Sequence, residues 1–425
     1  MVTDRPKISV IQPGARLHYA MPAVFAEAGI LRTLHTDLHA DHTLLRTLDW
    51  AIPERVRTKA LKRLLGRRLP DGLRRELVQD HPVTTAALHI SAILGLPFGG
   101  PERMTSRLLA DLEATQFEKG DIVYTVIVNE DVDVMSRLRD RGVRIIHECI
   151  IGPDVGLLLL EECERFPDLG PTPDRREVEA GRARDRLKYE VSDLILVPSK
   201  FTEKAVRELA PESAVIFRVP YGFDLTRFRR PNNPIPGRVL SVGTVGRRKG
   251  HPDLAAATRL LARKCSQVEV RVAGPVEGDI LGHPAMQGPV YLGQVPRSAV
   301  VEEFAKADVF ALPTICDSFG IAIIEAMAMG LPVVTTTHCG DIVRDGIDGF
   351  VVPIRDPETL AARIQEIIED RELRERMSKA AVERANEFSQ KAYASRLLRA
   401  VSQLNLEERE QNHLIDDFCE RRPRR

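Results

Sequence analysis

One carboxylate stands in an otherwise apolar run of nine residues. The stretch IAIIEAMAM (321–329) lies within CDSFGIAIIEAMAMGLPVV, and Glu325 is its only charged residue. A helix that is apolar on every side is normally buried, and an unpaired carboxylate in a protein core is costly. Glu325 therefore requires a polar partner, which is either a bound ligand or an Arg or Lys from elsewhere in the chain.

The residues before this run predict an anion site at the start of a helix. VFALP (309–313) has the composition of a buried strand, and the helix begins near Phe319 and Gly320. The first amides of a helix, here those of Phe319, Gly320 and Ile321, lack intrahelical acceptors and favour anions. Because Gly320 has no side chain, we expect it to let a ligand approach the backbone closely.

Two carboxylates flank this helix start. Asp317 lies just before it, and Glu325 lies about one and a half turns into it. Carboxylates accept hydrogen bonds, so hydroxyl groups such as a ribose diol or a sugar suit them. A nucleotide sugar carries a phosphate, a ribose and a sugar together, and it is the ligand that this arrangement favours.

A basic glycine turn supplies a second candidate anion site. In SVGTVGRRKG (241–250) a strand ends at Gly243, and the cations Arg247, Arg248 and Lys249 come just before a helix. Cations at the carboxyl end of a strand and next to a helix N-terminus can clamp phosphate groups. Charge runs are usually solvated surface features, so an exposed basic turn is the alternative.

The whole chain predicts two successive doubly wound α/β domains. Short β-branched runs alternate with segments of helical period, which is typical of parallel βαβ units. The predicted strands are residues 7–12, 122–128, 144–149, 194–199 and 214–220, followed by 238–243, 268–274, 309–313, 332–337 and 349–353. In such sheets ligands bind at the carboxyl ends of the strands, so we expect the site in a cleft between the domains.

A segment rich in Pro and Asn, LTRFRRPNNPIPG (225–237), separates the two sets of strands. We therefore predict a Rossmann-like domain over 1–228, a linker over 229–237 and a second Rossmann-like domain over 238–388. A helical tail over 389–425 completes the chain, and a return of this tail to the first domain is one option.

Composition and charge narrow the choice of partners. The 425 residues include 61 basic and 61 acidic side chains, so no overall field attracts nucleic acid, and none is predicted as a partner. The six cysteines show no zinc spacing and are expected to be free thiols of a reducing compartment. We find no signal peptide and no uncharged apolar run of 18 residues, so we expect a cytoplasmic protein without a membrane span.

A basic amphipathic segment in the first half has two interpretations. RVRTKALKRLLGRRL (55–69) places Val56, Ala60, Leu61, Leu64 and Leu65 along one stripe, with Arg and Lys around them. Such a helix either contacts the inner face of a membrane or packs on the domain core with a solvated back.

The second half resembles a known family. DSFGIAIIEAMAMGLPVV (317–334) is similar to the acid-x7-acid signature of the retaining glycosyltransferases of family 4, which have the GT-B fold. The resemblance continues through RVLSVGTVGRRKG, VEVRVAGPV, VYLGQVPRSAVVEEFAKADVFALP and GDIVRDGIDGFVVPIRDPETLA. It implies that Glu325 binds the donor ribose and that Asp317 lies against the transferred sugar. It also implies that Lys249 and the amides after Asp317 contact the donor diphosphate.

The chain departs from the family pattern at four places. His338-Cys339-Gly340-Asp341 replaces a Gly-Gly before an acid, and His338 is assigned only a place near the cleft. The first acid is Asp317, where Glu is more frequent. Thr244 stands where Arg usually follows the glycine of the strand, so Arg247 or Arg248 would supply the second cation. Tyr221 stands where Asn is usual in the turn that closes the first domain.

The first half resembles the family less strongly. His147 ends the strand IIHEC and is similar to a strand-end His that faces the donor sugar, although a structural histidine fits the position equally. Gly14 in QPGARLHYA is similar to the family's glycine loop near the diphosphate. Arg16, His18 and Tyr19 would then reach the acceptor.

A DxD sequence in NEDVDV (129–134) binds a divalent metal in the other large glycosyltransferase architecture. Here it follows a predicted strand and starts a helix, where Asn129 can cap and acids meet the helix dipole favourably. We therefore predict a structural role, and neither a metal nor another cofactor.

The sequence thus predicts a retaining glycosyltransferase that moves a sugar from a nucleotide diphosphate to a glycan, lipid-linked or small-molecule acceptor. The second domain binds the donor, and Asp317, Lys249, Arg247 and His147 are the predicted catalytic residues. The resemblance implies a front-face mechanism, in which the departing phosphate helps to deprotonate the acceptor. A noncatalytic nucleotide-sugar-binding partner in a polysaccharide assembly complex and a phosphorylase-like enzyme with this fold are the alternatives.

Overall fold

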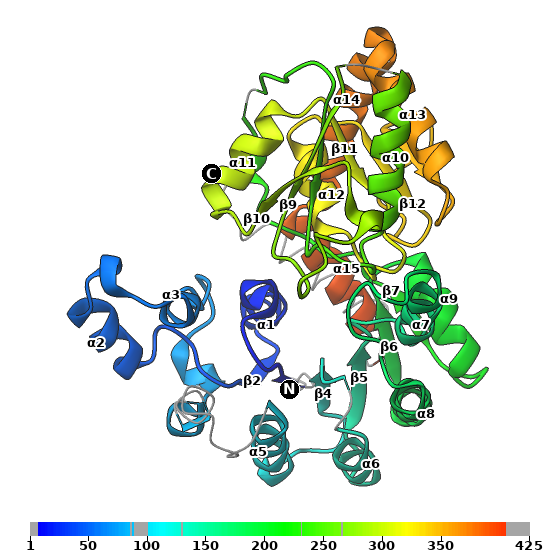
Figure 1. Cartoon of the computed structure of the whole chain (residues 1–425). Helices are drawn as coiled ribbons and strands as arrows, with labels where there is room; N and C mark the ends of the chain where they lie inside the picture. Colours follow the sequence, from blue (N-terminus) through cyan, green and yellow to red (C-terminus); the bar gives the residue numbers. More distant parts are fainter. Residues whose placement is uncertain are drawn as a thin grey trace.

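The computed structural model describes residues 7–85, 87–88, 101–128, 131–230, 232–264 and 267–404, which form two α/β domains (Figure 1). Each domain is built on one sheet whose strands are all parallel. The first sheet has seven strands in the order β3-β2-β1-β4-β5-β6-β7, and the second has six in the order β10-β9-β8-β11-β12-β13. The α/β fold class predicted from the sequence is confirmed.

The first domain contains strands β1 (Ile8–Ile11), β2 (Leu31–His35), β3 (Val78–Gln79), β4 (Ile122–Thr125), β5 (Arg144–Glu148), β6 (Leu194–Val197) and β7 (Ile216–Arg218). Its helices are α1 (Ala20–Glu27), α2 (Thr43–Ala51), α3 (Lys59–Leu65), α5 (Pro101–Ala114), α6 (Val132–Asp140), α7 (Val155–Arg165), α8 (Arg175–Val191) and α9 (Lys200–Leu209). Buried side chains of α5 and α6 pack on one face of the sheet, and those of α1 pack on the other.

The second domain contains strands β8 (Arg238–Val242), β9 (Glu269–Ala273), β10 (Val290–Gly293), β11 (Val309–Leu312), β12 (Val333–Thr336) and β13 (Gly349–Val352). Its helices are α10 (His251–Lys264), α11 (Arg297–Lys306), α12 (Ile321–Ala328), α13 (Pro357–Glu369) and α14 (Arg371–Asn386), and α15 (Gln390–Ser402) ends the described chain. Helices α10 and α13 cover one face of the sheet, while α11 and α12 cover the other.

All ten predicted strands are present, and three more were not predicted. β2 has the sequence LRTLH, in which Arg32 and Thr33 interrupt the apolar run, and β3 has only two residues. β10 lies at an edge of the second sheet and is largely uncovered, so its sequence lacks the apolar run of a buried strand. These short or edge strands therefore contain too few apolar residues to be recognised from the sequence pattern.

The chain crosses between the domains twice. Residues 219–237 lead from the first sheet to the second, and α15 returns and packs against α1 (Figure 1). The two crossings are bonded to each other, because the Phe223 amide donates to the Phe388 carbonyl (2.9 Å) and Arg396 donates to the Pro220 carbonyl (2.9 Å). The domains are thus joined by two crossing segments, which also contribute side chains to an apolar core shared by both domains.

Ion pairs hold helix α7 of the first domain to the second domain. Arg165 Nη2 lies 2.8 Å from Asp253 at the start of α10, and Arg355 Nε lies 2.6 Å from Glu162, which is fully buried. A buried carboxylate is costly unless it is paired, and here Arg165 and Arg355 both contact it. These pairs fix α7 against the carboxyl edge of the second sheet.

The basic segment 55–69 forms a shorter helix than predicted. Helix α3 covers only Lys59–Leu65, and Thr58 caps it by accepting from the Leu61 amide. Leu65 is buried with Leu38 and Leu45, so this side of the helix faces the domain, whereas Val56 precedes the helix and is exposed. Within the described ranges no helix has the length and hydrophobicity that crossing a bilayer requires.

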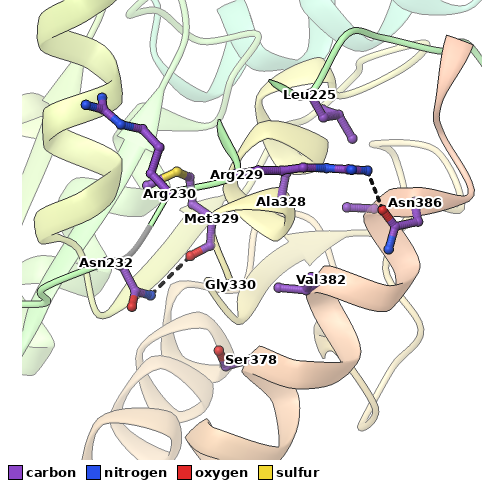
Figure 2. Close-up of a pocket in the computed structure, with 11 residues that line it drawn as sticks. Leu225, Arg229, Arg230, Asn232, Ala328, Met329, Gly330, Ser378, Val382 and Asn386 are labelled. Carbon is purple, nitrogen blue, oxygen red and sulfur yellow. Dashed lines mark hydrogen bonds between the residues drawn. The ribbon is translucent and has the colours of Figure 1, made fainter. Parts of the chain in front are cut away.

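A pocket of about 510 Å³ lies beside the linker (Figure 2). Arg229 donates to Asn386 (2.6 Å) and Asn232 donates to the Met329 carbonyl (3.1 Å) across it. Ala328, Met329 and Gly330, at the C-terminal end of α12, form part of its lining. The pocket is therefore at the opposite end of α12 from Asp317 and is not the predicted donor site.

Candidate active site

Asp317 and Lys249 meet at the carboxyl edge of the second sheet. β8 and β11 are parallel neighbours, so the loops that follow them leave from the same edge. Lys249 Nζ donates to the Asp317 carboxylate, and Arg248 Nη1 lies 3.4 Å from its other oxygen. The structure thus brings together two motifs that were recognised separately in the sequence.

The two loops are also bonded through their backbones. The Arg248 carbonyl accepts from the Ile315 amide and from Thr314 Oγ1, both at 3.0 Å. Gly250 has a φ of 69°, and a Cβ built on it would lie 1.8 Å from the Pro313 carbonyl oxygen. Only glycine allows the basic turn to lie this close to the end of β11, which places the Lys249 ammonium beside Asp317.

Gly243 directly follows β8 and begins this turn, as the sequence predicted. A Cβ built on it would be 3.6 Å from Cε of Lys249, so the glycine lies alongside the lysine stem. The stem is thereby held between the end of β8 and Asp317.

The start of α12 differs from the prediction in two respects. A Cβ on Gly320 would lie 2.6 Å from Cys339 Sγ, so the protein itself fills the space that was expected to admit a ligand. The Ile321 amide donates to the Phe319 carbonyl (3.2 Å) and is not a free donor. The amides of Phe319 and Gly320 have no hydrogen-bond partner among the described residues, and they remain the candidate donors to an anion.

The structure does not bring Arg247 to this cluster. Its side chain is buried and donates to the carbonyls of Phe166 (3.0 Å) and Pro171 (2.5 Å), which belong to the first domain. The guanidinium is thus bound to the first domain, so Arg247 joins the two domains and does not face Asp317. Arg248 is the neighbouring cation that lies at the carboxylate.

Glu325 is half-buried on α12, between side chains that are almost fully buried. No Arg or Lys in the described part of the chain forms an ion pair with it, so the internal salt bridge considered as an alternative is not observed. Burial raises the pKa of Glu325 to about 7, and Arg297 opposes this shift only partly. The described protein groups therefore offset only part of the cost of burying this negative charge.

The raised pKa of Glu325 predicts a pH dependence of stability. A carboxyl group whose pKa is higher in the folded state, here about 7 against 4.5, stabilises the fold below pH 4.5 and loses this contribution as pH rises through 7. Glu325→Gln removes the ionisation, so at pH 8 the ligand-free variant should be more stable than the wild type by roughly 1–2 kcal/mol. Urea unfolding at pH 8 and pH 5 measures this difference, which should shrink at pH 5. A variant that is less stable at pH 8 would contradict the assignment.

The loop after β1 reaches toward the second domain. Gly14 has a φ of 74°, and its amide donates to Asp37 (3.0 Å). The next residues include Leu17, His18 and Tyr19, which all have positive φ, a strained conformation that is frequent at functional sites. His18 Nε2 lies 3.5 Å from Arg297 Nη1 at the start of α11, and burial together with Arg297 lowers the pKa of His18. The loop predicted to face the acceptor therefore contacts the domain that carries Glu325.

The structure places His147 inside the first domain. Its ring is 5% exposed and lies 6.0 Å from the ring of Tyr189 on α8, with no contact to the Asp317 cluster among the described residues. Burial and the nearby Lys188 lower its pKa well below the usual range. Because side chains alternate along a strand, Glu148 points to the opposite face from His147. This placement matches the structural interpretation of His147.

Sequence reasoning missed Ser318 and Asp341 at the domain junction, and it gave His338 only a place near the cleft. Ser318 Oγ accepts from the Gly152 amide (3.2 Å), and Asp341 accepts from the Lys200 amide (2.9 Å). His338 stacks on Phe201, with ring centroids 4.6 Å apart. These residues stand in loops without a repeating pattern, so the only signal was their position after the strands β11 and β12.

The DxD segment is engaged in internal contacts where it is described. Asp131 accepts from Thr125 Oγ1 (2.6 Å) and pairs with Lys188 (2.9 Å), while the predicted cap Asn129 lies outside the described residues. No cluster of three or more His, Cys, Asp or Glu side chains suited to a metal occurs in the portion of the chain that the structure describes.

Comparisons with known proteins agree with the geometry. Residues 223–384 match the family model of glycosyl transferases group 1. The phosphatidyl-myo-inositol mannosyltransferase of Mycolicibacterium smegmatis is 30% identical over 198 residues, which cover 43% of this chain and 50% of that protein. The chain thus matches about half the length of the curated relatives to which it is similar.

Solved structures show the same fold at low sequence identity. A sucrose-phosphate synthase from Thermosynechococcus elongatus aligns with a TM-score of 0.59 at 17% identity, covering 94% of this chain and 99% of that one. The Anabaena protein HepE, solved in complex with UDP and glucose, aligns with a TM-score of 0.60 at 16% identity, covering 94% of this chain and 100% of that one. These similarities show the fold, which is the GT-B fold expected from the sequence.

Proposed function

Because residues 223–384 match the family model of glycosyl transferases group 1, we propose that this protein transfers a sugar from a nucleotide diphosphate sugar. The acceptor is a glycan, a lipid-linked molecule or a small molecule, and it binds on the side of the first domain. The neighbour HepE was solved with UDP and glucose, which supports a donor of this class.

The cluster around Asp317 is the observation that carries the proposal. Lys249 and Arg248 supply positive charge, and the amides of Phe319 and Gly320 supply free donors at the start of α12. Together they would stabilise the negative charge that develops on a departing diphosphate. Glu325 lies farther along the same helix, where it can accept from the ribose hydroxyls, and Asp317 lies against the sugar.

The reaction that we propose retains the anomeric configuration of the donor sugar. The described cluster contains no free nucleophile, since the Asp317 carboxylate is paired with Lys249 and Arg248. The neighbouring thiols Cys316 and Cys339 are buried, and burial raises both their pKa values to about 12. A front-face reaction fits this set of residues, with the departing phosphate taking the acceptor proton. Nuclear magnetic resonance of the product would show the configuration, and an inverted anomer would contradict the proposal.

A thermal-shift panel with UDP, GDP, ADP, CDP and dTDP, each with and without a sugar, tests the donor assignment. A nucleotide at 100 times its Kd should stabilise the fold by about 2.7 kcal/mol. Release of free nucleotide that depends on an acceptor would then distinguish a transferase from a noncatalytic binding partner. Release that instead depends on inorganic phosphate would indicate the phosphorylase-like alternative, and no shift with any member of the panel would remove the donor proposal.

We expect transfer to be independent of divalent metal. Two cations, Lys249 and Arg248, and the amides at the start of α12 neutralise the diphosphate in this proposal, so no metal is needed there. Activity should be essentially unchanged after treatment with excess EDTA and buffer exchange. A complete loss that manganese restores would instead favour the DxD segment as a metal site.

Peripheral contact with an anionic membrane is a second proposal, and Trp50 supports it. This residue lies in the last turn of α2, is 89% exposed and is the only Trp of the chain. Residues 43–76 contain ten basic and four acidic side chains. Arg or Lys near an anionic surface contributes about 1 kcal/mol each, and Trp favours the membrane interface. Vesicles of phosphatidylglycerol should blue-shift the Trp fluorescence at low salt, but not at high salt, and phosphatidylcholine vesicles are the control. An unchanged spectrum at low salt would contradict the contact.

A further inference from the structure

Glu148 is the centre of a buried hydrogen-bond network at the end of β5. Its carboxylate is 4% exposed and accepts from Tyr124 Oη (2.6 Å) and Tyr221 Oη (2.8 Å), and it pairs with Arg16 (3.0 Å). Burial raises the pKa of both tyrosines well above the usual range, so their hydroxyls stay protonated and donate. Three donors on one carboxylate hold all three side chains in a defined geometry.

Tyr221 belongs to this network and also touches the candidate donor site. Its hydroxyl accepts from Arg16 Nη2 (2.5 Å), and the Arg16 guanidinium lies 4.8 Å from the centre of its ring. The same ring meets Phe319 edge to face, with centroids 5.2 Å apart. Tyr221 is therefore in contact with the loop after β1, through Arg16, and with the loop that starts α12, through Phe319.

The position of Tyr221 in the chain strengthens this connection. It lies in the crossing between the domains, where Phe319 also packs on Phe223 and Phe388. Rings of the crossing segments thus surround Phe319.

We propose that Tyr221 is a positioning residue that couples the loop after β1 to the loop at Phe319, with Glu148 fixing its hydroxyl. This inference rests on the proposed function, in which Phe319 and Gly320 face the donor diphosphate and Arg16 lies on the acceptor side. Displacing a reacting group by about 1 Å can cost 100-fold in rate, so the relative position of these two loops matters for transfer.

Tyr124 is a matched control for this role. Its hydroxyl donates to the same Glu148, but its ring packs against Phe25 in the core of the first domain, with centroids 5.6 Å apart. Removing either hydroxyl deprives Glu148 of one donor. Of these two tyrosines, only Tyr221 has a ring contact with the second domain among the described residues, so only the loss of the Tyr221 hydroxyl should affect the loop at Phe319.

Hydrogen exchange in Tyr221→Phe and Tyr124→Phe tests the coupling without any ligand. The reporters are the amides of Asp317 and Ile323, which donate to the carbonyls of His338 (2.9 Å) and Gly320 (3.0 Å). Their exchange should accelerate about tenfold in Tyr221→Phe, which corresponds to about 1.4 kcal/mol, and stay unchanged in Tyr124→Phe. Equal acceleration in both variants, or none in Tyr221→Phe, would overturn the inference. Arg16→Met, at a half-buried site, provides the same test if Tyr221→Phe does not fold.

UDP affinity and transfer rate then separate this inference from the proposed function. If the wild type binds UDP, Tyr221→Phe should bind it several-fold more weakly than Tyr124→Phe at similar thermal stability. A wild type that binds none of the five nucleotides would remove the proposed function, whereas the exchange comparison would still decide the coupling. A wild type that transfers sugar while both variants retain full activity and unchanged exchange would remove the coupling alone.

Discussion

Replacing Lys249 with Met should lower the transfer rate by roughly 100- to 1,000-fold, the loss expected when one preorganised charge at a leaving group is removed. Met keeps the length of the side chain alongside Gly243 and removes the ammonium that lies at Asp317. The remaining cation, Arg248, is farther from the carboxylate, at 3.4 Å, and cannot replace a charge at the same point. The rate at saturating donor, measured by release of free nucleotide, is the appropriate readout.

Lys306→Met is the matched control for this substitution. Lys306 is an exposed residue at the end of α11, in the same domain, and its loss should leave the rate unchanged. Because Lys249 is paired with Asp317, its replacement also affects folding stability. The melting temperature of the variant is therefore compared with that of the control. A folded Lys249→Met protein with more than half of the wild-type rate would contradict the diphosphate clamp.

The location of Lys249 and Asp317 at the same edge of the second sheet was predictable from its parallel strands. Both residues follow buried parallel strands, and such strands present their carboxyl ends at one edge. The hydrophobic run of β11 is uninterrupted, and in β8 only Ser241 stands between apolar residues, so the strands and the loops after them could be placed from the sequence. What the sequence could not provide was the adjacency of β8 and β11, on which the contact depends.

The roles of Arg247 and Gly320 could not be predicted, because each depends on a partner distant in sequence. Arg247 stands beside Arg248 in the basic turn, yet its donors reach carbonyls more than seventy residues away. Gly320 fits a general rule for anion sites, but the atom that requires glycine is Cys339 Sγ, from the loop after β12. Local pattern identifies the type of site, whereas packing between loops decides which residue performs each role.

The same limit applies to the first domain. His147 and Glu148 are adjacent in the strand-end sequence, and alternation alone shows only that they face opposite sides. Packing of α8 on one side and of Tyr221 on the other determines that Glu148 joins the domain junction. Tyr221 lies in the crossing after β7, so its contact with Glu148 joins segments that are far apart in the sequence.

Glu325→Gln should weaken nucleotide binding by roughly 10- to 150-fold, because a ribose diol loses charge-assisted hydrogen bonds worth about 1.5–3 kcal/mol. The substitution keeps the size of the side chain, and the surrounding residues of α12 remain packed. If Glu325 instead paired with a buried cation, the substitution would strand that cation and cost about 3–5 kcal/mol of stability. The absence of an ion pair with a described Arg or Lys favours the first outcome.

Measuring nucleotide affinity and ligand-free melting on the same variant separates these outcomes. Glu383→Gln, at an exposed position of α14, is the control for the loss of one carboxylate. We expect weak binding by Glu325→Gln together with equal or higher melting at pH 8, since burial already opposes ionisation of Glu325. A large fall in melting temperature with unchanged affinity of the folded protein would remove the ribose assignment. The poorly compensated carboxylate on α12 would then be a structural cost without a role in binding the donor.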